Sequence, residues 1–283
     1  MKENAVDTIT SCMVVNDEFA HIQRIQIEHR LKLAQFWGIE KGSRILEIGC
    51  GQGDTTAVLA YLTGDDGFVH GIDIAAPDYG SPVTIGDSIN HLQHSKLGKQ
   101  IKVDFETDLL SQQVDFPENS FDIIVMSHCS WYFKSFEELS ELLKKARKWG
   151  SKLCFAEWDT RIQTIEQLPH LLSVLIQAQY ECFKENSLSN VRTMFTPDDI
   201  TTIASSVGWN IVDEKSINSK ELQDGEWEVD IALMDYHFEL SDIDNMPSKL
   251  KSLIKSEVNL LEESIKNHGI KSLSTHALIA DKR

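Results

Sequence analysis

Short apolar runs alternate with longer segments of helical periodicity through the first half of the chain. The runs have the length and β-branched content of buried strands. They cover residues 45–48, 68–74, 101–105, 121–126 and 152–158. The segments between them carry apolar residues three or four positions apart, which indicates helices that bury one face. This alternation predicts an α/β fold with a doubly wound, mostly parallel sheet.

The second half of the chain departs from this alternation. A long helical pattern fills residues 160–190, and two further helices are expected around residues 227–238 and 247–267. Apolar runs at residues 209–212 and 273–280 predict two more strands. Because the extra helices interrupt the strand–helix repeat, we expect them to form a cap beside the sheet.

The start of the chain is expected to hold one helix. Apolar residues at helical spacing run from Phe19 to Phe36, with Asn16 or Asp17 as a candidate N-cap and Gly38 as a stop. Residues 1–15 are expected to be a loose start without regular structure. The polar residues of this helix fit either a solvated face or a lid over a ligand.

These patterns divide the chain into a core and a cap. The core comprises residues 41–160, 196–220 and 271–283. The cap comprises an N-terminal lid at residues 1–40, a helical insertion at 161–195 and a second insertion at 221–270.

Three glycines follow the first apolar run, at Gly49, Gly51 and Gly53. Glycine lets the backbone turn sharply and lets a ligand lie against the main chain, because no Cβ intervenes. Thr55 then suits a helix N-terminus. Asp73 ends the second strand, 20 residues after Gly53, where a carboxylate can accept both ribose hydroxyls. Together these features predict a nucleotide-binding crevice.

Composition narrows the classes of partner. The net charge is −17, from 44 acidic and 27 basic residues, so we expect no nucleic-acid or anionic-membrane partner. The five cysteines form no C-x-x-C pair, which is typical of a reducing compartment. The chain start lacks the apolar core of a signal peptide, and no apolar run reaches spanning length, so a soluble, cytoplasmic protein is expected. His91 and His94 lack a third ligand at suitable spacing, so no metal site is predicted.

Four motifs resemble those of one enzyme family. Residues 47–53, an acidic residue followed by G-x-G-x-G, resemble the first motif of class I S-adenosylmethionine (SAM)-dependent methyltransferases. Asp73 stands at the second motif of that family, and Asp108 stands where its third strand ends. Residues 116–122 resemble the segment that opens the fourth strand in the small-molecule branch. The motifs occur in the family's order across residues 42–158.

The resemblance implies a seven-stranded sheet with one antiparallel strand near the C-terminus and SAM across the carboxyl ends of the first strands. The loop backbone would hold the methionine part, Asp73 the ribose, and Asp108 with Leu109 the adenine. The cofactor-binding residues implied in this way are Glu47, Gly49, Cys50, Gly51, Gly53, Thr55, Asp73, Ile74, Asp108, Leu109, Ser127 and His128.

The resemblance also places His128 beside the methyl acceptor. Methyl transfer is an in-line displacement at an activated carbon, so the protein mainly aligns the acceptor and excludes water. A base is needed only if the acceptor must lose a proton, and a histidine whose pKa lies near neutrality suits that role. The alternative is that His128 only hydrogen-bonds its loop.

The acceptor is expected to be a small molecule enclosed by the cap. Its identity, the atom methylated (O, N or C) and the choice between monomer and homodimer stay open. Each candidate contact is also explained by packing or solvation. The candidate contacts are Arg30, Trp131, Tyr132, Tyr180 and Trp227.

Three other functions compete with this interpretation. A nicotinamide dehydrogenase would favour G-x-G-x-x-G, whereas the third glycine comes one residue earlier here. A non-catalytic SAM-binding module would keep the fold without turnover. A protein or nucleic-acid methyltransferase is disfavoured because Ser127-His128-Cys129-Ser130 replaces an N-P-P-Y-type tetrapeptide.

Overall fold

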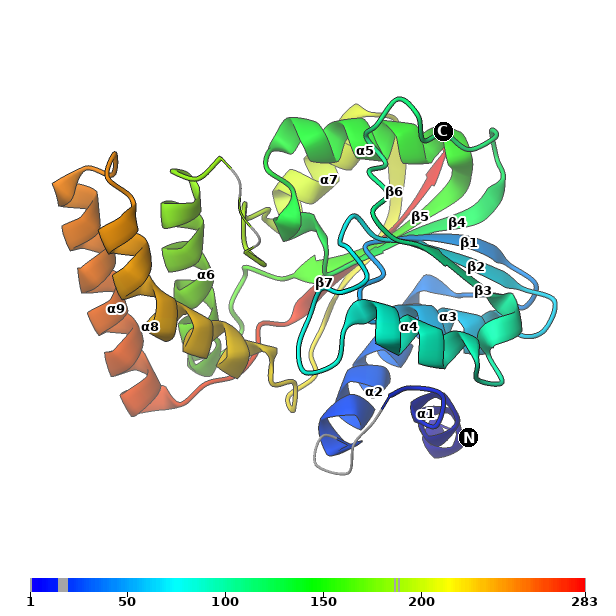
Figure 1. The fold of residues 1–283 in the computed structure, drawn as a ribbon, viewed down its shortest axis with the longest axis horizontal. Helices are drawn as coiled ribbons and strands as arrows, with labels where there is room; N and C mark the ends of the chain where they lie inside the picture. The colour runs from blue at the N-terminus through cyan, green and yellow to red at the C-terminus, as the bar shows by residue number, and fades with distance from the viewer. Residues whose placement is uncertain (1, 15–19, 186, 188, 283) are drawn as a thin grey trace.

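In the computed structural model, which describes residues 2–14, 20–185, 187 and 189–282, seven strands form one sheet (Figure 1). Their order is β3-β2-β1-β4-β5-β7-β6, and β7 runs antiparallel to β5 and β6 while the other pairs are parallel. The predicted doubly wound sheet with one antiparallel strand is confirmed. The strands are β1 (Arg44–Ile48), β2 (Phe68–Ile72), β3 (Ile101–Asp104), β4 (Phe121–Ser127), β5 (Gly150–Trp158), β6 (Trp209–Ile217) and β7 (Thr275–Lys282).

Helices cover both faces of the sheet (Figure 1). α5 (Phe136–Trp149) and α7 (Pro197–Ser206) pack on one face. Each begins where a hydroxyl, of Ser135 or Thr196, accepts a backbone N–H three residues later. The other face carries α1 (Lys2–Thr10), α2 (Ala20–Trp37), α3 (Asp54–Thr63) and α4 (Ile85–Gln93). Short 3₁₀ turns are η1 (Gly98–Gln100), η2 (Ser130–Tyr132) and η3 (Ile165–Gln167).

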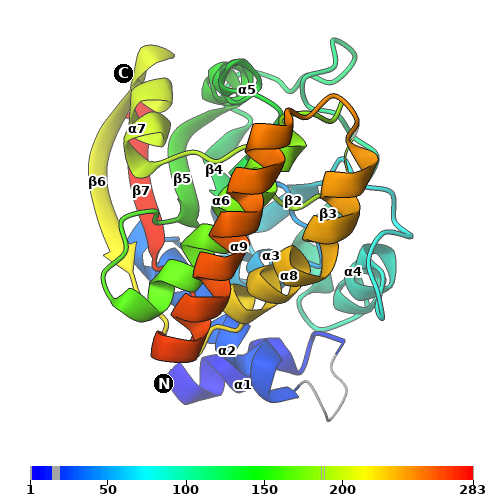
Figure 2. The same ribbon diagram turned by 90° about the vertical axis from the view of Figure 1, so that its left-hand side faces the viewer.

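Three further helices form a bundle beside the sheet (Figure 2). They are α6 (Leu168–Glu181), α8 (Asp224–Asp242) and α9 (Ser248–His268). The bundle has its own apolar core, which includes Leu172, Ile176, Val229 and Leu261. It faces the edge at which the parallel strands end (Figure 1). Ligands of open α/β sheets bind at this edge.

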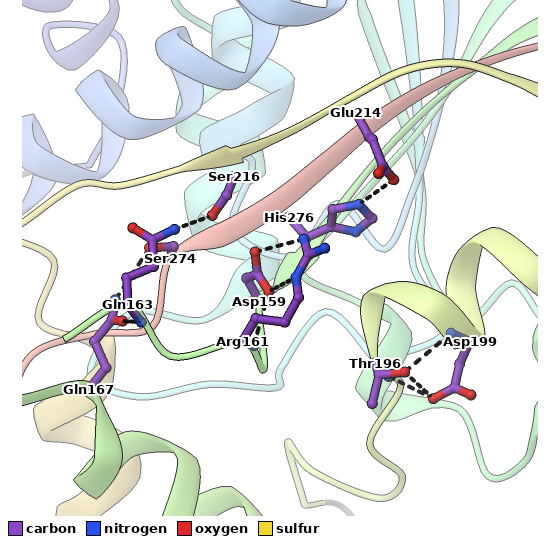
Figure 3. A network of polar contacts seen from close by, with 10 residues as sticks. All are labelled: Asp159, Arg161, Gln163, Gln167, Thr196, Asp199, Glu214, Ser216, Ser274 and His276. Carbon is purple, nitrogen blue, oxygen red and sulfur yellow. Dashed lines mark hydrogen bonds and ion pairs between the residues drawn. The ribbon is translucent and has the colours of Figure 1, made fainter. Parts of the chain in front are cut away.

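Polar contacts fasten the segment between β5 and α6 to the antiparallel strands (Figure 3). The Asp159 N–H donates to the Ser274 carbonyl at 2.7 Å. Gln163 Nε2 donates to Ser216 Oγ at 2.8 Å, and Gln167 Nε2 donates to Ser274 Oγ at 3.3 Å. These contacts fix the point at which the bundle leaves the sheet.

Three elements differ from the sequence-based expectations. Residues 2–10 form α1, where a loose start was expected. The helix is favourable because Val6 and Ile9 share one of its faces and belong to the apolar cluster that also contains residues of α2 and α3. The long pattern at 160–190 is helical only from Leu168 to Glu181, after a 3₁₀ turn. β6 extends to Ile217 beyond the expected 209–212, since the exposed face of this edge strand is polar. The N-cap expected at Asn16 or Asp17 lies outside the described residues.

All five cysteines are free thiols. Within the described ranges no cluster of three histidine, cysteine or carboxylate side chains could hold a metal ion. In the same part of the chain, no helix has the length and apolar character needed to cross a bilayer.

Candidate functional site

The glycine loop between β1 and α3 adopts backbone conformations that favour glycine. Gly49, Gly51 and Gly53 have φ angles of +74°, +50° and +90°. A Cβ on Gly49 would lie 2.6 Å from Cys129 Cβ, and one on Gly53 would lie 2.7 Å from Ile89 Cδ1. A Cβ on Gly51 would meet no protein atom within 4 Å. The loop is therefore packed from behind at two glycines and open in front at the middle one.

Asp73 joins this loop to the end of β2. Its Oδ2 accepts the Gly51 N–H at 2.8 Å, and its Oδ1 accepts the Ala75 N–H at 2.9 Å. A carboxylate offers about four lone-pair positions, so both oxygens can still accept from a ligand. The neighbouring Ile74 side chain is 68% exposed and presents an apolar surface next to the carboxylate.

Glu47 supports the loop from behind. Its side chain is 1% exposed, and Oε2 accepts the Thr56 hydroxyl at 2.6 Å. Burial raises the pKa of Glu47 to about 8, with the nearby Asp54 and Asp73 adding to the rise. Glu47 is therefore mostly protonated at pH 7, and it connects β1 to α3 as a neutral hydrogen-bonding group.

The loop after β3 forms the next wall. Asp108 is exposed, and its Oδ1 accepts the Leu110 N–H at 2.8 Å, while Leu109 is buried. Lys145 Nζ of α5 donates to the Leu109 carbonyl at 2.6 Å and to the Ser111 carbonyl at 3.0 Å. One lysine thus holds this loop against α5.

His128 follows β4 with a left-handed φ of +53°. Its Nδ1 contacts Ser127 Oγ at 3.1 Å, and its Nε2 contacts Thr275 Oγ1 at 3.1 Å. Its ring centroid lies 4.6 Å from that of Trp158, which ends β5. Burial, followed by the positive charge of Arg30, lowers the pKa of His128 well below its usual range. The expectation of a pKa near neutrality was therefore wrong, and the imidazole is neutral at physiological pH.

Glu157 fixes the turn that follows His128. Its Oε2 accepts the Ser130 N–H at 2.9 Å and the Ser130 hydroxyl at 2.7 Å. Burial raises the pKa of this carboxyl group. Burial likewise raises the pKa of the Cys50 and Cys129 thiols, so neither is a thiolate at neutral pH.

Comparison with known proteins decides the family. A family model described as a methyltransferase domain matches residues 19–214, which is more than half of the chain. The chain belongs to the class I SAM-dependent methyltransferases. The open glycine loop and the accepting carboxylate of Asp73 fit an adenosyl ligand, and SAM is the methyl donor of this family.

Solved and curated relatives agree with this family. A cyclopropane-fatty-acyl-phospholipid synthase-like protein from Lactobacillus casei is 33% identical, with a TM-score of 0.89 over 99% of both chains. Methyltransferase phomM' of Diaporthe leptostromiformis is 27% identical over 60% of this chain and 54% of its own length. The match thus spans about half of that relative. The fold is also shared by Haemonchus contortus phosphoethanolamine N-methyltransferase 2, which was solved in complex with SAM. The sequence identity is 15% and the TM-score 0.53, over 89% of this chain and 52% of that one.

Three of the five expected acceptor contacts have side chains that lie outside the apolar cores. Arg30 is half-buried, and its buried Nη1 has no hydrogen-bond partner in the part of the chain that the structure describes. Tyr132 is 39% exposed and donates to Asn190 Oδ1 at 3.1 Å. Trp227 is 44% exposed at the start of α8.

The other two acceptor candidates lie in apolar cores. Trp131 packs under α5 and α7, and its indole N–H donates to the Phe195 carbonyl at 3.3 Å. Tyr180 packs inside the helix bundle. The structure does not bring either side chain to the site, because aromatic residues at helical or turn positions serve packing equally well.

Two carboxylates on α8 were missed by sequence reasoning. Asp224 and Glu228 lie one helical turn apart on α8, and burial raises the pKa of both. Gln26 of α2 donates to Asp224 at 2.8 Å, and Gln177 of α6 donates to Glu228 at 2.8 Å. Their only sequence signal was helical spacing, which many solvated carboxylates share.

A second missed group surrounds His128. His29 of α2 contacts Thr275 Oγ1 at 3.0 Å, and its centroid lies 5.5 Å from that of His128. His170 of α6 accepts the Leu273 N–H on Nδ1 at 3.0 Å, and its buried Nε2 has no partner among the described residues. These residues are far apart in sequence, so no local motif marks them.

Proposed function

We propose that this enzyme transfers the methyl group of SAM to a small molecule held between the carboxyl edge of the sheet and the helical cap. The observation that carries this proposal is the cluster of Ser127, His128, Thr275 and Trp158 at the ends of β4, β5 and β7. It combines neutral hydrogen-bonding groups with an aromatic wall, next to the strands that carry the glycine loop. Such a combination suits an enclosed, mostly uncharged acceptor site.

The cofactor contacts follow from the loop. The backbone at Gly49 to Gly53 would receive the methionine part, and Asp73 would accept the ribose hydroxyls. Ile74 and Leu109 would border the adenine. Arg30 lies close enough to lower the pKa of Glu47, and its unpartnered Nη1 suits the methionine carboxylate.

The cap would complete the acceptor side. It comprises the predicted lid at 1–40 and the insertions at 161–195 and 221–270. Tyr132 reaches Asn190, which in turn hydrogen-bonds Glu228 of α8. This chain of polar contacts links the turn after β4 to the cap, so an acceptor lying there would meet both.

The protein's contribution to the chemistry is alignment, exclusion of water and proton handling. SAM, when bound, supplies a methyl group that is already activated for displacement. A hydroxyl, amine or acidic carbon acceptor must also lose a proton. His128 is neutral, so its imidazole is able to take that proton by way of Ser127 Oγ, which lies 3.1 Å from Nδ1.

The test is release of S-adenosylhomocysteine from SAM in the presence of pooled small molecules, with peptide and protein pools in parallel. We expect release with a small-molecule pool. Release with protein pools alone, or SAM binding without any release, contradicts the proposal and favours a protein methyltransferase or a non-catalytic module, respectively.

The His128→Asn variant tests the base. Asparagine tolerates the left-handed backbone at this position, so we expect the variant to fold. Turnover should fall by roughly 100-fold or more while the SAM Kd changes by less than about twofold. Equal losses of turnover and SAM affinity would assign His128 a purely structural role.

A further inference from the structure

A continuous chain of hydrogen bonds leads from the end of β4 to the protein surface. From the inside outward it contains Ser127, His128, Thr275, His29, Ser219 and Lys32. The first three contacts measure 3.1 Å from Ser127 Oγ to His128 Nδ1, 3.1 Å from His128 Nε2 to Thr275 Oγ1 and 3.0 Å from Thr275 Oγ1 to His29 Nε2. The last two measure 2.9 Å from His29 Nδ1 to Ser219 Oγ and 3.0 Å from Lys32 Nζ to Ser219 Oγ.

Each interior member of the chain can both accept and donate a proton. The hydroxyls of Ser127, Thr275 and Ser219 have one donor and two acceptor positions. A neutral imidazole accepts on one nitrogen and donates from the other. Burial lowers the pKa of both His29 and His128 well below the usual range, so both rings are neutral.

The outer end reaches the surface at Lys32, while Ser219 itself is 9% exposed. Lys32 is exposed, and its ammonium can only donate, so it occupies one lone pair of Ser219 Oγ. Ser219 can then accept from His29 on the other lone pair and direct its own proton to water. Burial, together with the nearby charges of Arg30 and Lys32, disfavours a proton that rests on His29, so the ring stays neutral between transfers.

We propose that this chain conducts the acceptor's proton from Ser127 to solvent at Ser219 during methyl transfer. The proposal rests on the methyltransferase activity proposed above. Ser127 and His128 lie at the reacting end, whereas Thr275, His29 and Ser219 act through them as positioning residues.

The proton transfer balances without any other reactant. The bond between the acceptor atom and its hydrogen breaks, and its electron pair stays on the acceptor atom, which keeps the methyl group. The proton passes to Ser127 Oγ as the Ser127 proton moves to His128 Nδ1. His128 Nε2 gives its proton to Thr275, and Thr275 gives its own to His29 Nε2. His29 Nδ1 gives a proton to Ser219, which releases one to water.

Thr275 is the link at which the chain is best interrupted. Its side chain is fully buried at the start of β7, between two histidines that come from α2 and the end of β4. Valine has nearly the same shape and strand preference but no hydroxyl. Serine keeps the hydroxyl and loses only a methyl group.

The experiment compares Thr275→Val and Thr275→Ser with wild type on two acceptors. These are taken from the molecules that the S-adenosylhomocysteine release screen identifies, or from analogues of those molecules. One acceptor carries a proton on the attacking atom, and the other, a tertiary amine or thioether, carries none. We expect Thr275→Val to lower kcat by roughly tenfold or more for the first acceptor only, with the SAM Kd changed by less than about twofold. Thr275→Ser should keep most of the wild-type kcat for that acceptor.

Other outcomes overturn the proposal. Equal losses on both acceptors would assign Thr275 a packing role, and full activity of Thr275→Val would show that no proton passes through it. A wild type that methylates neither acceptor overturns the proposed function together with the relay. If Thr275→Val does not fold, Ser219→Ala at the outer end provides the same comparison, and the same outcomes decide it.

Discussion

Asp73→Ala removes the carboxylate that bridges the glycine loop and the end of β2. In the wild type, both oxygens accept backbone N–H groups, from Gly51 at 2.8 Å and Ala75 at 2.9 Å. The same oxygens are proposed to accept the ribose hydroxyls of SAM. The variant should therefore weaken SAM binding both by losing ribose contacts and by loosening the loop.

The size of the effect follows from hydrogen bonds to a charged group, each of which contributes about 1.5–3 kcal/mol. Losing one or two of them predicts a loss of about 1.5–6 kcal/mol in SAM binding, or roughly 10- to 20,000-fold in Kd. Asp73→Asn keeps the shape and one accepting oxygen, so its loss should be smaller, at about tenfold. The free energy of unfolding should fall by about 1–2 kcal/mol in Asp73→Ala, because the two N–H groups are part-buried and can still reach water.

The assay is calorimetric titration of SAM into both variants and wild type, with urea unfolding as the control for folding. A S-adenosylhomocysteine analogue without the ribose 2′-hydroxyl sharpens the assay. It should bind wild type more weakly than S-adenosylhomocysteine does, and Asp73→Ala should weaken its binding less than that of S-adenosylhomocysteine. A folded Asp73→Ala protein that binds SAM like wild type would refute the ribose assignment. Additive losses from the analogue and the variant would also refute it.

Three further predictions concern the supports of the cofactor site. Gly51 and Gly42 both have a positive φ and open space for a Cβ, so substitution of either by alanine should cost about 1 kcal/mol of stability. Only Gly51→Ala should also bind SAM more weakly in calorimetry, and equal SAM affinities of the two variants would contradict a ligand lying against Gly51. Because the pKa of Glu47 is raised, its contribution to stability is complete below pH 4.5 and is lost as the pH rises to about 8. In urea unfolding, the free energy of unfolding of wild type should therefore fall relative to that of Glu47→Gln by up to about 1.4 kcal/mol per pH unit, and parallel pH profiles would argue against a protonated carboxyl group. Lys145→Met should raise the SAM Kd several-fold because it releases the loop after β3. Lys144→Met, at an exposed lysine on the same helix, should leave the Kd unchanged, and equal Kd values for the two variants would show that the loop needs no anchor.

The sheet was predictable because its strands are buried on both faces and read as continuous apolar runs. β6 was truncated in the prediction because it is an edge strand, and Asp213 and Glu214 lie on its exposed positions. α1 was missed because its apolar residues are few, and only packing against α2 and α3 makes a helix favourable there.

The two halves of the candidate site differed in how far sequence could identify them. The cofactor half depends on residues that follow single strands, such as Gly51 and Asp73, so short motifs carry it. The other half joins His29 to Thr275 across 246 positions, and only the fold brings these side chains together. The pKa of His128 was misjudged for the same reason, since burial by distant elements decides it.

Transfer of a labelled methyl group tests the central claim most directly. The protein is incubated with SAM that carries a trideuterated methyl group and with the small-molecule pool that released S-adenosylhomocysteine, and products are identified by mass spectrometry. We predict one small-molecule product in which a hydrogen is replaced by the intact trideuteromethyl group. Its yield should fall strongly in the Asp73→Ala reaction at a SAM concentration below the raised Kd of that variant. SAM binding without label in any small molecule would contradict the account.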